Sequence, residues 1–310
     1  MFPETVRNLL VRFTGWSYGL QGNLAKAPRF DGVEDFRKAD HSLFPIHLNI
    51  DACGFVWVNL EASTTPSVSW ESQCAGADTQ ARLSAFNMDS YIYDHSWSMP
   101  GPFNWKTLID NYNECYHCSV AHPGIAATTD LPNYAVETEG NFIAHFARPK
   151  PEFATANNSN VAPTFVFPSS SATINTVYMY LMRVVPTGPA SVNMQYEVYR
   201  HSSCSDEEFT EMDEFMKQIE NEDRVLCTEV QRNLKAGVYE AGPLNPKTEK
   251  GVRYFQRLVK EALTTHQVEE RRAEKEIWPA KKSTNGTETE AEEKFCETLC
   301  VKDGAKELDW

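Results

Sequence analysis

Apolar residues follow two different periods along this chain. Apolar runs at residues 91–97, 175–185 and 191–199 predict β-strands, with a further possible strand at 141–146. Residues 206–236 and 248–265 are predicted to be helical. In the first of these helices the apolar residues recur every three or four positions, so we expect them to form a stripe that faces a core: Phe209, Met212, Phe215, Met216 and Ile219.

The segments between these elements have other compositions. Residues 15–60 predict short strands and turns, and residues 61–85 are rich in Ser, Thr and Gln, which predicts a linker. Residues 123–172 contain many Pro, Asn, Ser and Thr and predict long loops over an active site. Beyond about residue 270 the chain is dominated by Glu, Lys and Thr, which predicts a disordered tail.

Composition limits the classes of protein to consider. With 310 residues and 41% hydrophobic content, the chain can bury one large domain plus a smaller piece. No apolar run approaches the roughly 20 residues that span a bilayer, and residues 1–13 lack a secretory signal, so we expect a cytoplasmic protein with no membrane partner. The net charge of −14 argues against nucleic acid as a partner and is compatible with a cationic substrate.

Residues 104–123 place two imidazoles and two carboxylates in one short stretch. If residues 104–117 are helical, Asp110, Glu114 and His117 line one face. His122 follows His117 by five residues, so both imidazoles reach one metal only if the backbone breaks between them, and Pro123 is suited to such a break. Two His and a distant carboxylate are typical of non-haem Fe(II) sites that keep positions open for O₂.

Other interpretations of this stretch stay open on spacing alone. The imidazoles and acids could simply be surface groups that are unrelated to one another. A zinc hydrolase is less favoured, because the helical zinc motif keeps its His four residues apart with a Glu directly after the first. Cys115 and Cys118 flank His117 and suggest a redox or zinc pair, although reduced thiols are the default for the eight scattered cysteines.

The same stretch resembles a known family signature. Residues 104–123 read NWKTLIDNYNECYHCSVAHP, which resembles the catalytic domain of Rieske non-haem iron oxygenase large subunits, especially the choline and carnitine monooxygenase branch. Residues 15–24 (GWSYGLQGNL) and 54–60 (GFVWVNL) resemble parts of the family's Rieske domain. Residues 221–234 (NEDRVLCTEVQRNL) are similar to the helix that supplies the third iron ligand. The resemblance covers about residues 11–265.

The resemblance implies roles for four residues. It makes His117 and His122 the imidazole ligands of Fe(II), and Asp223 the carboxylate ligand. No local pattern singles out Asp223, because it lies far along the chain among acids that look equally eligible: Glu220, Glu222 and Glu229. Glu114 stands where the family has a catalytic acid that bridges the iron to the Rieske cluster of a neighbouring subunit, and Glu is typical there of carnitine-type enzymes.

The N-terminal part departs from the family pattern. A Rieske [2Fe–2S] centre needs two Cys and two His, but Val11 and Thr14 stand where the second Cys and the second His are expected. The chain begins only ten residues before Val11, so the first Cys-x-His pair has no counterpart. We therefore expect an N-terminally truncated Rieske domain that cannot assemble the cluster.

The resemblance implies an α+β fold, in which an antiparallel sheet with long helices forms a helix-grip catalytic domain behind a β-rich Rieske remnant. The expected divisions are residues 1–60 (remnant), 61–85 (linker), 86–269 (mononuclear iron domain) and 270–310 (tail). The implied assembly is a homotrimer that receives electrons from a ferredoxin or reductase.

The implied reaction hydroxylates a carbon next to the nitrogen of a choline-like quaternary ammonium compound, as in glycine betaine synthesis, with O₂ and two electrons delivered through the Rieske centre. A quaternary ammonium favours an aromatic cage, and several aromatic residues lie in segments that could border the site: Trp97, Phe103, Tyr112, Tyr116, Tyr178, Tyr180 and Tyr196. Two alternatives remain, an aromatic-ring hydroxylase and a non-catalytic helix-grip subunit that binds a ligand or regulates an intact homologue.

Overall fold

The structure of the chain is a computed structural model that describes residues 8–154, 160–239 and 242–281. Its contacts divide the chain into two compact units. Among the described residues, the first comprises 8–49, 56–67 and 278–281, and the second comprises 50–55, 68–154, 160–239 and 242–277.

Short strands make up the first unit. β1 (Asn8–Leu10), β2 (Ser17–Gly19) and β3 (Leu24–Lys26) form one antiparallel sheet, and the 3₁₀ helix η1 (Lys38–His41) follows. Trp16, Phe30 and Phe36 pack over the buried residues of this sheet. β4 (His47–Ile50) and β5 (Val56–Asn59) form a separate two-stranded sheet.

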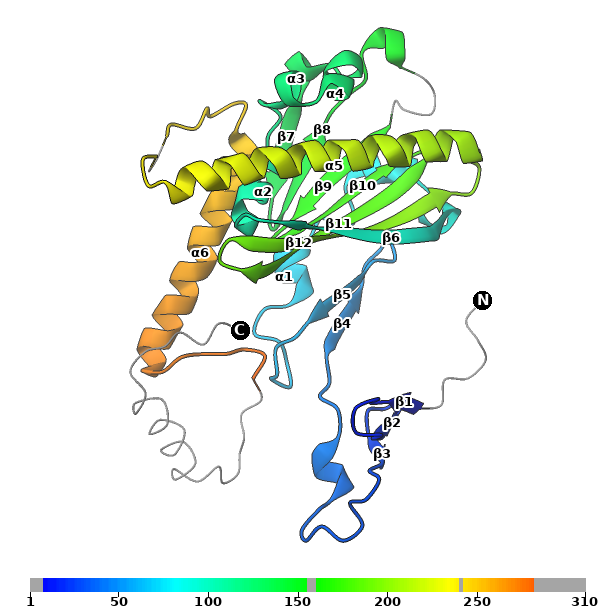
Figure 1. Ribbon diagram of the computed structural model, residues 1–310, viewed down its shortest axis with the longest axis vertical. Helices are drawn as coiled ribbons and strands as arrows, with labels where there is room; N and C mark the ends of the chain where they lie inside the picture. The colour runs from blue at the N-terminus through cyan, green and yellow to red at the C-terminus, as the bar shows by residue number, and fades with distance from the viewer. Residues whose placement is uncertain (1–7, 155–159, 240–241, 282–310) are drawn as a thin grey trace. The chain divides into compact units, whose positions relative to one another are not determined.

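The second unit is built on one antiparallel sheet (Figure 1). Within the described residues it has seven strands in the order β6-β12-β11-β10-β9-β8-β7. The strands are β6 (Tyr91–Gly101), β7 (Ala135–Glu139), β8 (Phe142–Phe146), β9 (Val161–Val166), β10 (Ser170–Asn175), β11 (Tyr178–Gly188) and β12 (Ser191–His201).

Helices cover this sheet, and Figure 1 shows the long α5 lying across it. The helices are α1 (Trp70–Cys74), α2 (Trp105–Tyr112), α3 (Cys118–Ala121), α4 (Pro123–Thr128), α5 (Asp206–Lys235) and α6 (Lys250–Ala273), with 3₁₀ helices η2 (Ala81–Ala85), η3 (Met88–Ser90), η4 (Leu131–Asn133) and η5 (Pro151–Phe153). α2 packs against both α5 and α6.

Local chemistry fixes the start of α5. The Ser205 side chain accepts a hydrogen bond from the Glu208 backbone N–H, and the Glu208 carboxylate accepts one from the Ser205 backbone N–H, which makes a capping box. Three acids in the first turn complement the positive end of the helix dipole. Thirty residues of regular helix follow.

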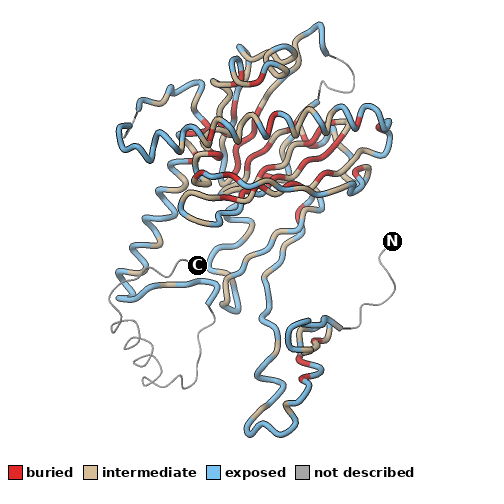
Figure 2. The backbone as a smooth tube through the Cα atoms, in the orientation of Figure 1, coloured by how far each residue is buried: buried red, intermediate tan, exposed pale blue. Residues whose placement is uncertain are grey.

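The main core lies between the sheet and the helices. Figure 2 shows the buried positions gathered on the strands of the large sheet and on the inward side of the helices. Phe103, Phe165 and Phe255 have no exposed surface, and they come from the segment between β6 and α2, from β9 and from α6. Phe165 and Phe255 meet edge to face, with ring centroids 5.7 Å apart. This core holds α2 and α6 against the sheet.

The structure confirms the predicted α+β class, the strands at 91–97, 141–146, 175–185 and 191–199, and the two long helices. The loops predicted for residues 123–172 are wrong in part, because α4 and β7 to β10 lie there. Composition hid both strands, because β9 contains Pro163 and β10 is rich in Ser and Thr. Thr suits a pleated sheet once both neighbouring strands are present. The expected domain limits remain a prediction, and most of the expected tail lies outside the described residues.

None of the helices among the described residues is both long enough and apolar enough to span a bilayer. This agrees with the hydropathy of the sequence.

Gly251 in α6 offers a test of how closely the helices are packed. A Cβ atom at this position would lie 2.2 Å from the backbone oxygen of Asn113, directly after α2. We expect Gly251→Ala to lower the free energy of unfolding by roughly 1–3 kcal/mol, because overpacking outweighs the better helix propensity of Ala. Urea unfolding measures this change.

Gly32→Ala is the matched control, because no atom lies within 4 Å of the added methyl group. Its stability should stay within about 0.5 kcal/mol of the wild type. A Gly251→Ala protein as stable as the control would contradict the close packing of α6 on the end of α2.

Candidate metal centre

A turn between α2 and α3 carries the first candidate residues. α2 ends at Tyr112, and Asn113 caps it by donating from its amide to the Ile109 carbonyl. The Glu114 carboxylate then accepts hydrogen bonds from the backbone N–H groups of Tyr116 and His117. A continuous helix over 104–117 is therefore wrong, because the Glu114 side chain competes for backbone donors and stabilises a turn.

Asp110 does not join this turn. Its carboxylate accepts a hydrogen bond from the Gln256 amide of α6 at 3.1 Å, and burial raises its pKa to about 6. The face expected to combine Asp110 with Glu114 and His117 does not form.

The predicted backbone break between the two histidines is present. His117 precedes α3, and His122 separates α3 from α4 with φ −119° and ψ 84°, outside the helical region. Pro123 is the first residue of α4, where its missing N–H costs no helix hydrogen bond. The break turns the His122 ring back toward His117, and the two Nε2 atoms lie 3.1 Å apart.

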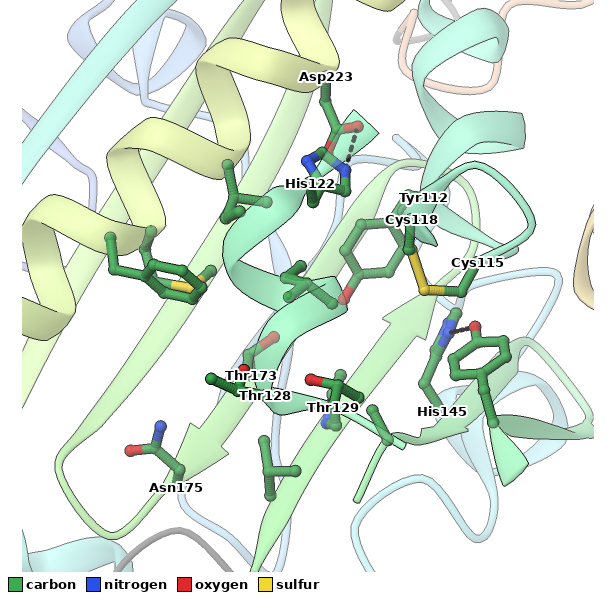
Figure 3. A pocket seen from close by; sticks show the side chains of 18 of the residues that line it. Tyr112, Cys115, Cys118, His122, Thr128, Thr129, His145, Thr173, Asn175 and Asp223 are labelled. Carbon is green, nitrogen blue, oxygen red and sulfur yellow. Dashed lines mark hydrogen bonds and ion pairs between the residues drawn. A yellow bond between two sulfur atoms is a disulfide. The ribbon is translucent and has the colours of Figure 1, made fainter. Parts of the chain in front are cut away.

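The Asp223 carboxylate of α5 completes this group. Its Oδ1 lies 3.1 Å from His122 Nε2 and 3.4 Å from His117 Nε2. Figure 3 shows the carboxylate reaching the His122 ring. Two imidazole nitrogens and one carboxylate oxygen thus converge on one point, as a 2-His-1-carboxylate set requires.

The outer nitrogen of each imidazole also has a carboxylate partner. His117 Nδ1 bonds the Glu114 carboxylate, and His122 Nδ1 lies 2.7 Å from Glu222 Oε2. A carboxylate at Nδ1 holds the proton there and leaves the lone pair of Nε2 facing inward, which is the arrangement of a ligating histidine. The set therefore fits a divalent metal.

Asn111 bonds the same carboxylate oxygen of Asp223 that contacts the two imidazoles. Its amide donates to Asp223 Oδ1 at 2.7 Å, from the last turn of α2. The sequence did not single out Asn111, and it did not predict the contact of Glu222 with His122. Both residues lie among polar neighbours that look equally suitable for these roles. Glu229, another of the eligible acids, pairs instead with Arg232 on the exposed side of α5.

The ion pairs shift the pKa values of the three central groups. Burial lowers the pKa of His117, but hydrogen bonds to Asp223 and Glu114 outweigh it and raise that pKa to about 9. The pKa of His122 is raised in the same way by Asp223 and Glu222 against the effect of burial. Burial would raise the pKa of Asp223, but the two imidazoles hold it at about 2. In the metal-free protein the His117 imidazole is therefore protonated at neutral pH.

Glu220 lies one turn before Asp223 and behaves differently. Burial is the main cause that raises its pKa to about 8, and the nearby Asp223 adds to the effect. The Tyr196 hydroxyl donates to Glu220 Oε2 at 2.8 Å, and the Tyr196 ring stacks on Trp97 at 4.0 Å between centroids. Glu220 is thus a core residue in this structure.

A cavity of about 340 Å³ opens beside these groups. Figure 3 shows Thr128, Thr129, Thr173 and Asn175 on the part of its wall away from Asp223. Among the described residues that line it there is no lysine or arginine. The nearby guanidinium of Arg82 instead donates to the backbone carbonyls of His145 and Pro163.

The aromatic candidates divide between the cavity and the core. Tyr112 and Tyr178 line the cavity. Phe103, Tyr180 and Tyr196 are buried in the core with Trp97 packed against them, and Tyr116 is 72% exposed. Two cavity aromatics were missed, Tyr134 and Phe215. Phe215 belongs to the apolar stripe of α5, whose predicted core face also lines the cavity.

Cys115 and Cys118 form a disulfide that lines the same cavity (Figure 3). The default of reduced thiols is therefore wrong for this pair. The other described cysteines are free: Cys53, Cys74, Cys204 and Cys227. Cys296 and Cys300 lie outside the described residues.

Solved structures with the same fold are Rieske oxygenases. A quaternary ammonium Rieske monooxygenase, studied for carnitine oxidation by gut microbiota and inter-subunit electron transfer, superposes with a TM-score of 0.71 at 25% identity, over 82% of this chain and 72% of that one. Naphthalene 1,2-dioxygenase from Rhodococcus sp. matches with a TM-score of 0.58 at 15% identity, over 81% of this chain and 74% of that chain, and so shares the fold. The fold is that of an oxygenase catalytic subunit.

The family model described as "Ring hydroxylating alpha subunit (catalytic domain)" matches residues 88–265, and the chain belongs to this family. The carnitine monooxygenase oxygenase subunit of Escherichia coli (strain K12) is 25% identical over 73% of this chain, and the chloroplastic choline monooxygenase of Beta vulgaris is 26% identical over 81%. The chain spans 62% and 57% of their respective lengths.

The positions that the resemblance assigns to the Rieske cluster do not fit one. Val11 offers an isopropyl group, and the Thr14 hydroxyl accepts a hydrogen bond from the Trp16 backbone N–H at 3.2 Å. Neither side chain replaces a thiolate or an imidazole on iron.

The raised pKa of His117 predicts how metal binding depends on pH. A metal must displace the imidazole proton, so we expect the affinity to rise roughly tenfold per pH unit for each displaced proton, and to keep rising until about pH 9. Zn²⁺ titrations by calorimetry, in buffers of different ionisation enthalpy, measure both affinity and released protons. An affinity that levels off near pH 7, as ordinary imidazoles predict, would contradict the ion pairs described above.

Proposed function

We propose that this chain is the catalytic part of an oxygenase that holds one Fe(II) through His117, His122 and Asp223. The convergence of their two Nε2 atoms and one carboxylate oxygen within 3.4 Å carries the proposal. A zinc hydrolase would use similar ligands, but the family to which the chain belongs favours oxygen chemistry. Iron bound here would supply activation of O₂, because three protein ligands leave coordination positions open.

The residues around the proposed ligands hold those ligands in the orientation that a metal requires. Glu114 and Glu222 hold the outer nitrogens of His117 and His122, so each ring presents Nε2 inward. Asn111 holds the carboxylate of Asp223. Glu114 also remains the proposed link to the electron-delivering cluster of a neighbouring subunit. The electrons would enter the site from the side of the turn that Glu114 forms.

The proposed substrate is a small quaternary ammonium alcohol of the choline type. Carboxylates of Glu114 and Asp223 line one part of the cavity and favour a cation, and Tyr112 and Tyr178 present rings suited to an ammonium group. A carboxylate such as that of carnitine would find no lysine or arginine among the described lining residues. The threonines and Asn175 offer neutral partners for a hydroxyl group.

The proposed reaction inserts one oxygen atom of O₂ into a C–H bond of this substrate. The other oxygen atom leaves as water, which requires two electrons and two protons. A ferredoxin or reductase would supply the electrons through a Rieske cluster. Because Val11 and Thr14 cannot hold this cluster, it would have to belong to an intact homologous subunit. The likeness to a structure described for inter-subunit electron transfer supports an assembly of several subunits, and the homotrimer that the resemblance implies stays a prediction.

Ligand variants test the metal assignment. His117→Ala and Asp223→Ala should each weaken Fe(II) binding by more than about 100-fold, beyond the 10–100-fold loss typical of a partner outside the coordination sphere. Anaerobic metal analysis after reconstitution measures the stoichiometry. Glu229→Ala is the matched control on α5, because this acid lies on the exposed side, and it should bind iron as the wild type does. Equal iron content in all four proteins would reject the ligand set.

Ligand binding tests the substrate class. Choline should raise the melting temperature of the metal-loaded protein more than L-carnitine at equal concentration, because a ligand that binds only the folded state stabilises it. Tyr178→Leu should weaken choline binding by about 0.5–2 kcal/mol if the ring contacts the ammonium group. Tyr116→Leu, at an exposed ring outside the cavity, is its control. A response to an aromatic acid and to no quaternary amine would instead indicate a ring hydroxylase.

A further inference from the structure

The Cys115–Cys118 disulfide lies against the two imidazoles of the candidate centre. Cys118 Sγ is 4.0 Å from His117 Nε2. One ligand atom from each of Cys118, His117 and His122 can be chosen so that all three lie within 4.8 Å of one another. Cys118 is 5% exposed, so its sulfur faces the site rather than solvent. A potential sulfur ligand therefore stands beside the proposed iron ligands.

We propose that this cysteine pair selects between two ligand sets that share the same imidazoles. With the disulfide closed, Asp223 completes the set and the site suits Fe(II). With the disulfide reduced, the Cys118 thiolate joins His117 and His122, and the site preferentially holds Zn²⁺. This inference rests on the metal site of the proposed function, but its readout is independent of oxygenation.

Ligand chemistry explains why the two states differ. A sulfur bonded to another sulfur is a poor metal ligand, whereas a thiolate is soft and favours zinc together with imidazole. Activation of O₂ needs a redox-active metal such as iron, whereas Zn²⁺ has no redox chemistry. The reduced state would therefore lose oxygen chemistry even with a metal bound.

The redox step balances with simple reagents. A dithiol reductant transfers two electrons and two protons to the Cys115–Cys118 disulfide, which yields two thiols and one oxidised dithiol. Hydrogen peroxide reverses the step, giving the disulfide and two molecules of water. Zinc binding to Cys118 then releases the thiol proton.

Position in the chain couples the pair to the site. Cys115 directly follows Glu114, and Cys118 is the first residue of α3, so the disulfide closes the turn that presents His117. Opening it frees this turn at the point where the Glu114 carboxylate accepts backbone hydrogen bonds. Reduction thus both releases the sulfur and loosens the turn that carries His117.

Cobalt substitution tests the inference on the full chain. Co²⁺ is added anaerobically to peroxide-oxidised and dithiol-reduced protein after each reagent has been removed. Differential alkylation with peptide mass spectrometry confirms the state of Cys115 and Cys118. We expect sulfur-to-cobalt charge-transfer absorption in the reduced protein only, and a Zn²⁺ affinity roughly tenfold or more higher in that state.

Three variants separate the sulfur ligand from other effects of reduction. Cys115→Ser leaves the Cys118 thiol unpaired, so without peroxide treatment it should show the charge-transfer band with no need for the dithiol, whereas Cys118→Ser should show the band in neither state. Cys204→Ser removes a free, buried cysteine outside this cavity and should respond as the wild type does.

Identical cobalt spectra in the two states of the wild type would overturn the inference, whether or not the variants fold. A band that persists in Cys118→Ser would do the same, as would failure of peroxide to form the disulfide. If cobalt binds without a sulfur band, the metal site of the proposed function survives and only the cysteine switch is rejected. If no metal binds in either state, both are rejected.

Discussion

The pairing of two imidazoles with three carboxylates, across a break in the backbone, is the interaction on which the site depends. Asp223 contacts both Nε2 atoms, and Glu114 and Glu222 hold the outer nitrogens. Because Asp223 and Glu222 come from α5, the turn and the short helices α3 and α4 are anchored to the most regular element of the fold. Without these contacts, α3 and α4 are too short to hold their own orientation.

Two acids one turn apart on α5 differ in ionisation because their neighbouring groups differ. Asp223 has a pKa of about 2, because the attraction of two imidazoles outweighs the cost of burial. Glu220 has no imidazole partner, and burial raises its pKa to about 8, so it is mostly neutral at pH 7. The same helix thus supplies one ionised carboxylate at the candidate metal centre and one neutral core side chain. This limits the negative charge that the fold must bury next to the metal position.

Periodicity in the sequence predicted the elements whose burial is one-sided, including α5, β11 and β12. It failed for β9 and β10, because Pro163 interrupts the apolar residues of β9, and the polar Thr173 and Asn175 of β10 line the cavity. The local sequence did not single out Asp223, because several other acids lie near it. However, Asp223 continues the apolar stripe of Met212, Met216 and Ile219 at the same spacing. A carboxylate in an apolar stripe is a signal of function. The turn at Glu114 could not be predicted from periodicity, because it depends on hydrogen bonds from the backbone to the Glu114 side chain.

The candidate metal centre and the far wall of the cavity come from different parts of the chain. α5 and the segment from α2 to α4 supply the ring nitrogens and carboxylates, whereas β10 supplies Thr173 and Asn175 to the cavity wall. The ion pairs that fix the imidazoles do not involve β10, so a substitution there changes what the cavity accepts while the Nε2 atoms stay in place. A single basic residue at such a position would provide the missing partner for a substrate carboxylate. For the proposed substrate, selection against a carboxylate therefore follows from the absence of lysine and arginine among the described residues of the cavity wall, and the proposed metal ligands take no part in it.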